Sequence, residues 1–265
     1  MTKDHSATRS AWQVQRGVLF ALLLRELKTR FGGRWLGVIW VVAEPLAHVL
    51  LLMLVFGYLR HRLLSGVDYA MFLVAGLLPF LMFRNVALRL MDAVDSNRGL
   101  FGYRQVKPMD AMVSRAVLEV CVYSAVYLLV LGLMGWLGYA VAPARPLELM
   151  ATSVVLLLGA FGLGLVLAIV TDNVPKARGL VRIAFFPIYL ISGVILPVQA
   201  LPAEVLPWLL WNPVLHALEI SRGLFFRGYT TVSDASAAFV FACALVALAL
   251  GLSLYRVRRH RLLAT

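Results

Sequence analysis

Residues 151–170 read ATSVVLLLGAFGLGLVLAIV, and residues 171–182 continue as TDNVPKARGLVR. The first stretch carries no charge over roughly the twenty residues that an α-helix needs to cross a bilayer. The second stretch places lysine and arginine directly after it. Because lipid offers the backbone no hydrogen-bond partners, such a run predicts a membrane-spanning helix followed by a positively charged gap.

Other apolar runs along the chain repeat this pattern. We expect spanning helices at about 36–59, 70–91, 112–141, 148–170, 179–198 and 235–256. The chain is 62% hydrophobic and 14% charged, whereas a soluble domain carries roughly a quarter charged residues. The predicted fold class is therefore an all-α polytopic membrane protein with six transmembrane helices over residues 36–256. Small residues predict close helix packing, namely Gly132, Gly135, Gly138, Gly159, Gly162 and Gly164.

The basic residues alternate strongly from one gap to the next. Residues 3–34, 84–115, 176–182 and 256–261 hold 20 of the 25 lysines and arginines. The other gaps hold only Arg60, Arg62, Arg145, Arg222 and Arg227. Positive charge stays on the cytoplasmic side of membrane proteins, so both termini are predicted to be cytoplasmic, with a basic tail at 257–265. The net charge of +12 does not indicate nucleic-acid binding, because the basic residues flank apolar runs.

The N-terminal arm, residues 1–35, carries an amphipathic pattern. Phe20, Leu24, Leu27 and Phe31 share one helical face, and Arg25, Lys28 and Thr29 lie on the other side. This pattern predicts an interfacial helix that lies in the headgroup plane with its apolar face toward lipid. The alternative is a plain, positively charged anchor.

The stretch 199–234 is apolar but interrupted by Pro202, Pro207 and Pro213. Prolines at this density prevent a helix from spanning. We expect short, broken helices that enter the periplasmic face after the fifth span and return, buried in protein or lining a cavity. Within this stretch His216, Glu219 and Arg222 follow helical spacing. They form either an ion pair that stabilises a short helix or an outer gate and substrate contact.

Glu44 lies inside the first predicted span, with His48 one turn later on the same face. An ionisable residue in a membrane helix is costly and therefore marks a functional-site candidate. The alternative is that Glu44, near the cytoplasmic end, pairs with an arginine at headgroup level. Two ligands are too few to indicate a metal site.

Residues 92–110 form the second cytoplasmic gap and contain the apolar and aromatic residues Leu100, Phe101, Tyr103 and Val106. These residues are typical of a surface that docks on a cytoplasmic partner. An ordinary positively charged loop is the alternative.

Aromatic side chains recur in the spans and in the broken segment. Their flat faces can stack against the rings of a substrate, but aromatic residues also form ordinary interfacial belts. The residues in question are Tyr69, Phe72, Phe80, Phe83, Phe185, Tyr189 and Trp211.

The sequence contains no G-x-x-x-x-G-K-[ST] motif, so a phosphate-binding loop of that kind is absent. A protein that moves a substrate, with its energy source on another chain, is the interpretation we favour. An ion-coupled carrier needs charges near mid-membrane, for which Glu44 and Glu119 are the candidates. A membrane-embedded transferase needs a cluster of polar catalytic groups at one membrane face, and the sequence contains none.

Several ordered motifs together resemble the permeases of type-2 ABC exporters, most closely the capsular polysaccharide (KpsM-type) permeases. The N-terminal motifs are Arg25-Glu26-Leu27-Lys28-Thr29-Arg30-Phe31, Leu36-Gly37-x-x-Trp40 and Glu44-Pro45-Leu46-Ala47-His48. The later ones are Ser192-Gly193-Val194-Ile195-Leu196-Pro197, Leu201-Pro202, Trp211-Asn212-Pro213, His216, Glu219 and Arg222. The resemblance covers roughly residues 20–256.

This resemblance implies a homodimeric permease in a Gram-negative inner membrane, with two separate ATPase subunits bound below it. ATP and Mg²⁺ would bind the ATPase, and this chain would hold no cofactor, no metal and no catalytic residue. Contacts with the ATPase would come from Phe20, Leu24, Leu27, Arg98, Leu100, Phe101, Tyr103 and Arg104. Candidates for the substrate route or a subunit seam are Glu44, His48, Tyr189, Trp211, His216, Glu219 and Arg222.

The cargo implied by the resemblance is a lipid-linked acidic polysaccharide, and the aromatic faces named above can stack against its sugar rings. A periplasmic co-polymerase and an outer-membrane exporter would continue its route. Permeases for O-antigen, teichoic acid or a drug remain alternatives within the same class.

Overall fold

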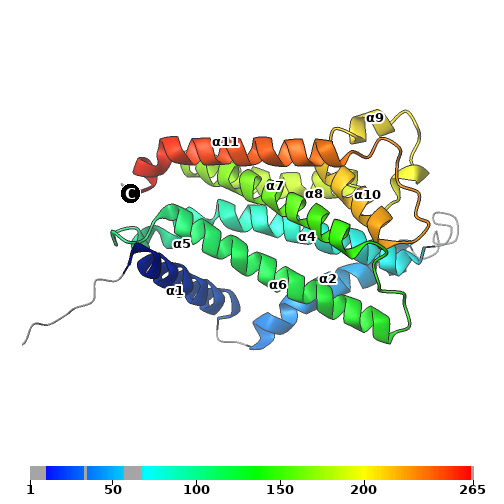
Figure 1. Ribbon diagram of the computed structural model, residues 1–265, viewed down its shortest axis with the longest axis horizontal. Coiled ribbons are helices and arrows are strands. Elements are labelled where there is room, and N and C mark those ends of the chain that lie inside the picture. Colours follow the sequence, from blue (N-terminus) through cyan, green and yellow to red (C-terminus); the bar gives the residue numbers. More distant parts are fainter. Residues whose placement is uncertain (1–9, 33–34, 57–66, 264–265) are drawn as a thin grey trace, which may run out of the picture.

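The computed structural model describes residues 10–32, 35–56 and 67–263, and these ranges contain helices and no strand. Long helices run side by side in one bundle, and α1 lies at the same end as the C-terminus (Figure 1). The long helices are α1 Ala11–Phe31, α2 Trp35–Phe56, α4 Tyr69–Met91, α6 Pro108–Trp136, α7 Pro146–Asn173, α8 Ala177–Ile191 and α11 Ala237–Leu263. The short ones are α5 Ala93–Asn97, η2 Arg98–Leu100, η3 Val198–Ala200, α9 Leu206–Leu209 and α10 Pro213–Phe225.

Five helices in the described ranges are long and apolar enough to cross a membrane, namely α2, α4, α6, α7 and α11. They confirm five of the predicted spans. The expected span at 179–198 is not confirmed at full length, because α8 has only 15 residues. At 1.5 Å per residue it measures about 22 Å, less than the hydrocarbon thickness. The chain leaves the helix at Ser192 and turns at Gly193, whose φ is +67°.

The C-terminal helix also differs from the prediction of a separate basic tail. α11 continues through the basic residues to Leu263, so the predicted tail from 257 onward is largely the last two turns of this helix. Arg60 and Arg62, which belong to the first predicted outer gap, lie outside the described residues.

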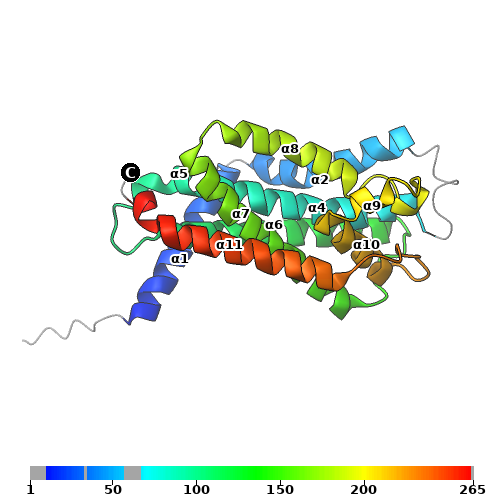
Figure 2. The ribbon, with the colours of Figure 1, turned by 90° about the horizontal axis from the view of Figure 1, so that it is seen from above.

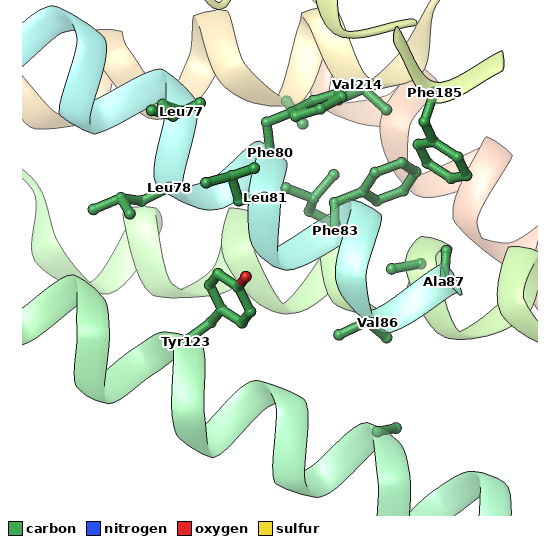
Figure 3. Close-up of a cluster of buried hydrophobic side chains, with 14 of the residues drawn as sticks. Leu77, Leu78, Phe80, Leu81, Phe83, Val86, Ala87, Tyr123, Phe185 and Val214 are labelled. Carbon is green, nitrogen blue, oxygen red and sulfur yellow. The ribbon is translucent and has the colours of Figure 1, made fainter. Parts of the chain in front are cut away.

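The core of the bundle centres on α4. Phe80, Phe83 and Val86 of this helix pack with Tyr123 of α6 and Phe185 of α8 (Figure 3). By contrast α2 and α11 are mostly exposed. Figure 2 shows α2 and α8 on one side of α4, with α11 on the other side. The α2–α8 side is therefore a face of the bundle that the described chain leaves largely uncovered.

Glycines on α7 permit close approach of its neighbours, as the sequence predicts. A Cβ atom on Gly162 would lie 2.4 Å from the backbone nitrogen of Leu248 in α11. A Cβ atom on Gly164 would lie 2.7 Å from the Cβ of Leu90 in α4. Gly132 in α6 has open space beside it, so it does not mediate packing among the described residues.

The N-terminal helix α1 runs across the long helices rather than along them (Figure 2). Ser10 caps its first turn through a hydrogen bond from the backbone N–H of Gln13 to the Ser10 hydroxyl, and Gly32 ends it in the left-handed conformation. Leu22 and Glu26 are buried against the bundle. The apolar face defined by Phe20, Leu24 and Leu27 is exposed and therefore points away from the bundle.

The segment 199–234 is broken into short helices, as predicted from its prolines. η3, α9 and α10 lie at the end of the bundle opposite α1 and the C-terminus (Figure 1). Among them α10 packs against α4, α7 and α11 and is largely buried.

Candidate functional site

Polar side chains gather in four places: the contact of α1 with α5 and α6, the 92–110 segment, the interior of α10 and the α2–α8 face. The first, here called the α1 seam, consists of Glu26, Asn97 and Arg115 with a second group of Arg30, Arg89 and Glu119. Glu26 is buried and accepts two hydrogen bonds from Arg115, at 2.9 and 3.0 Å. Asn97 of α5 donates to the same carboxylate at 3.1 Å. This bidentate, fully partnered pairing binds α1 to α5 and α6.

The second group of the α1 seam is centred on the buried Glu119 of α6. Arg30 of α1 forms an ion pair with Glu119, and the Arg89 Nε lies 3.3 Å from its carboxylate. Burial, and after it the neighbouring Arg89, lower the pKa of Arg30 to about 10, so Arg30 stays charged at neutral pH. Glu119 is therefore a paired structural carboxylate, which removes it as a candidate for ion coupling.

The 92–110 segment folds as α5, η2 and a turn, and ion pairs fix it to the neighbouring helix ends. Arg98 contacts Asp95 at 2.8 Å and Asp172, at the end of α7, at 2.5 Å. The hydrogen bond with Asp95 is the main reason that the pKa of Arg98 is raised. Arg178 of α8 also pairs with Asp95. These ion pairs therefore join the segment to α7 and α8.

The predicted docking residues of this segment are not all available at the surface. Phe101 is buried in the main core, which corrects its interpretation as a docking anchor, and Leu100 is half-buried. Tyr103 and Arg104 are exposed. Phe101 therefore positions the segment, and the residues after it form the accessible surface.

Arg222 and Glu219 form a fully buried ion pair at 3.3 Å inside α10. Arg222 also donates to the carbonyl oxygens of Gly193 and Val194, at 2.7 and 3.1 Å. Its guanidinium carbon lies 3.6 Å from the ring centroid of Phe72 in α4. The pair thus joins α10, α4 and the turn after α8, which is a structural role wider than a local helix contact.

Glu219 has further partners besides Arg222. The Tyr229 hydroxyl lies 3.0 Å from one carboxylate oxygen, and the Gln199 amide donates to the other at 3.2 Å. Burial, followed by the negative charge of Glu219, raises the pKa of Tyr229. Tyr229 therefore remains a neutral donor, and this network fixes the loops on either side of α10.

His216 is held by backbone groups on both ring nitrogens. Nε2 lies 2.8 Å from the carbonyl oxygen of Leu210, and the backbone N–H of Ser236 donates to Nδ1 at 3.0 Å. Because Nδ1 accepts, Nε2 carries the proton of a neutral ring. His216 thereby connects α9 to the start of α11 and is not available to a substrate.

Glu44, His48 and Tyr189 meet on the α2–α8 face. The Tyr189 hydroxyl lies 3.0 Å from His48 Nε2. The Glu44 side chain is 47% exposed, and its carboxylate is 3.8 Å from a terminal nitrogen of Arg84. A pocket of about 190 Å³ lies beside them, lined by His48, Leu81, Arg84, Leu88, Arg182, Phe185, Phe186 and Tyr189. An arginine therefore lies close to Glu44, as the alternative interpretation of this residue requires.

Most aromatic residues considered for sugar stacking are buried within the subunit. The buried ones are Tyr69, Phe72, Phe80, Phe83, Phe185 and Tyr189. Within one subunit their faces therefore pack between helices. Trp211, after α9, is 81% exposed and remains a candidate for contact with the substrate.

Arg84, Asn97 and Arg115 were missed by sequence reasoning. Arg84 carried a usable signal, because it is a charge seven residues before the end of a predicted span. Asn97 and Arg115 carried none, because their partner Glu26 is 71 and 89 residues away. In the described ranges, no group of three or more His, Cys, Asp or Glu side chains is placed to hold a metal ion.

The sequence is similar to known proteins along most of its length. Residues 17–226 match the family described as ABC-2 type transporter. The chain is 37% identical to the polysialic acid transport protein KpsM of Escherichia coli, over 97% of this chain and 99% of that protein. It is 28% identical to the capsule polysaccharide export inner-membrane protein CtrC of Neisseria meningitidis serogroup B, over 92% and 93%.

A shorter similarity joins the chain to an exporter of another polysaccharide. The O-antigen export system permease protein RfbA of Myxococcus xanthus is 31% identical, over 44% of this chain and 45% of that protein. Similarity to capsule export proteins therefore covers nearly the whole chain, and similarity to the O-antigen permease covers less than half.

Proposed function

This chain belongs to the ABC-2 type transporter family, and we propose that it is the permease subunit of an ABC exporter that moves capsular polysaccharide across the bacterial inner membrane. The observation that carries the proposal is the match to a polysialic acid transport protein over 97% of the chain. Five apolar helices long enough to span a bilayer are consistent with a membrane subunit. The shorter match to the O-antigen permease makes an O-antigen cargo the weaker alternative.

In the proposed topology α8 supplies the sixth crossing. It runs along the same bundle as the five longer helices, and the turn after it extends toward the end where α9 and α10 lie (Figure 2). An even number of crossings keeps α1 and the C-terminus at one end, and their basic residues make that end cytoplasmic. α9 and α10 then form the periplasmic, re-entrant segment. α1, which runs across the bundle, lies in the inner headgroup plane.

ATP hydrolysis belongs to two separate ATPase subunits that bind ATP and Mg²⁺. The sequence has no phosphate-binding loop of the Walker type, which supports this division. The exposed residues Tyr103 and Arg104 and the outer face of α1 form the proposed contact with the ATPase. The α1 seam and the ion pairs of Arg98 would carry its motion to α6, α7 and α8.

A second copy of the chain packs against the α2–α8 face in the proposed homodimer. Leu50, Leu54 and Phe186 are 60%, 84% and 65% exposed on this face. The same face presents the half-exposed carboxylate of Glu44, which is costly against lipid. A subunit seam that opens into the substrate route accommodates both the apolar side chains and the carboxylate.

The cargo proposed is a lipid-linked acidic polysaccharide. One relative is named for polysialic acid transport, which supports an acidic polymer. After the crossing, a periplasmic co-polymerase and an outer-membrane exporter continue the route to the cell surface.

Deletion of the gene in the bacterium that encodes it tests the proposal. We expect the surface capsule to disappear while capsular polysaccharide accumulates in the cytoplasm, and we expect restoration by this chain expressed together with its ATPase. A surface capsule that persists, with loss of O-antigen from the lipopolysaccharide instead, would transfer the assignment to the O-antigen alternative.

A further inference from the structure

The pocket of about 190 Å³ between α2, α4 and α8 has a polar wall built by three helices. His48 comes from α2, Arg84 from α4, and Arg182 and Tyr189 from α8. The remaining lining is apolar, with Phe185 and Phe186 among it. Two guanidinium groups from different helices thus border one small volume.

Arg84 lacks hydrogen-bond partners in the described part of the chain. Its Nε is buried and has no acceptor there. Its ion contact is the Glu44 carboxylate at 3.8 Å, which is too far for a hydrogen bond. Arg222, whose Nε is likewise unpaired, still donates to two backbone carbonyls and contacts Glu219. The donors of Arg84 therefore require an acceptor that the described residues do not supply.

The neighbouring charges leave room for such an acceptor. One terminal nitrogen of Arg182 donates to Asp92 at 2.8 Å, and Asp92 is not part of the pocket lining. The Tyr189 hydroxyl is already engaged with His48. Glu44 is 47% exposed and is not part of the pocket lining. Its carboxylate would nevertheless weaken the attraction of an anion, and removal of that charge should strengthen anion binding.

The depth of the pocket matches a lipid head group. Arg84 lies seven residues before the end of α4, or about 10 Å along the helix. Arg182 lies five residues after the start of α8, and the exposed side chains of Leu180 and Ile183 flank it. Basic pockets between transmembrane helices on the cytoplasmic side bind the phosphates of lipid head groups.

We propose that this pocket binds the phosphate of a lipid head group, with Arg84 and Arg182 as its donors. The inference rests on the proposed function in one respect, because the basic end of the bundle must face the inner leaflet. The phosphate belongs either to a membrane phospholipid or to the lipid anchor of the cargo, and the same chemistry serves both. Its position on the proposed seam places the bound lipid at the cytoplasmic end of the substrate route.

Native mass spectrometry of the purified full chain tests the site, with phosphatidylglycerol, phosphatidylcholine and diacylglycerol as probes. We expect phosphate-bearing lipids to bind and diacylglycerol, which lacks phosphate, not to bind. Arg84→Gln should weaken phosphatidylglycerol binding about tenfold, since it removes a charged donor. Arg182→Gln should weaken it as well, while Glu44→Gln should strengthen it.

Two control variants separate the site from general charge effects. Arg256→Gln removes an exposed arginine of α11, elsewhere on the chain, and should leave binding unchanged. Asp92→Asn breaks the pair with Arg182 but retains both guanidinium groups, so binding should persist. If Arg84→Gln fails to insert or fold, Arg182→Gln still tests the site independently.

A second arm identifies the source of the phosphate. Lipid extracts from capsule-producing cells and from cells that make no capsule are offered to the same protein. Binding from both extracts assigns the site to a membrane phospholipid, and binding from the capsule-producing extract alone assigns it to the cargo anchor. Equal binding of diacylglycerol, or unchanged binding in both arginine variants, overturns the proposal. Because no transport is measured, a failure of this binding is distinguishable from a failure of capsule export.

Discussion

Arg222→Met removes the cation of the buried pair in α10 and leaves Glu219 charged. Arg222 is fully buried, donates to two backbone carbonyls and stacks over Phe72. Removal of one partner from a buried ion pair costs about 3–5 kcal/mol, because the remaining charge is uncompensated. We expect the free energy of unfolding, measured by SDS titration in mixed micelles, to fall by that amount.

Glu219→Gln separates the charge of the pair from its hydrogen bonds. The substituted amide would keep polar contacts with Gln199 and the Tyr229 hydroxyl, and Arg222 would keep its carbonyl acceptors. We expect a loss of about 1.5–3 kcal/mol, the value of a hydrogen bond to a charged group. The double variant should lose less than the sum of the two single losses, since both single variants disrupt the same contact.

Arg145→Met provides the matched control for the same substitution. Arg145 is an exposed arginine with a Glu148 partner at 3.5 Å, also three residues away. Its replacement should change stability by no more than about 0.5 kcal/mol. Two results would contradict the structural role of this pair. The first is a stability loss in Arg222→Met no larger than in Arg145→Met. The second is a stability loss in the double variant equal to the sum of the losses in Arg222→Met and Glu219→Gln.

Four further substitutions test other parts of the structure. Glu26→Ala leaves the buried Arg115 without its carboxylate partner and should release α1 from the bundle. Hydrogen exchange in residues 11–31 should then be faster, and protection equal to wild type would contradict this. Tyr103→Ser should weaken association with the ATPase about tenfold in a pull-down titration, and unchanged association would place the contact elsewhere. Gly162→Ala should destabilise the protein by about 1–3 kcal/mol because it meets the backbone of α11, whereas Gly132→Ala, which meets open space, should not. Glu44→Ala should reduce capsule export while insertion stays normal, and export at the wild-type rate would make Glu44 a tolerated boundary residue.

The long helices could be predicted from the sequence because hydropathy and charge are local properties. An apolar run such as 151–170 has no alternative to a helix in lipid, whatever its neighbours are. The broken helices after α8 follow from Pro202, Pro207 and Pro213 for the same local reason. The short length of α8 was harder to predict, because the apolar pattern continues past Ser192, where the helix ends.

Contacts between distant residues could not be predicted in the same way. Glu26 enters the sequence analysis only as part of an N-terminal motif, yet Arg115 is its partner across 89 residues. Tyr189 is a predicted route candidate, and its contacts with Phe80 and His48 depend on how α8 lies against α4 and α2. Arg222 lies in the broken segment that the prolines predict, but its contact with Phe72 depends on how α10 lies against α4.

Transport by the reconstituted protein tests the central claim most directly. The chain is placed in proteoliposomes with and without its ATPase, and lipid-linked capsular polysaccharide is presented on the ATPase side. The proposed function predicts that polysaccharide becomes protected on the opposite side only when both subunits and hydrolysable ATP are present. Transport by this chain alone, or transport driven by an ion gradient without ATP, would contradict it.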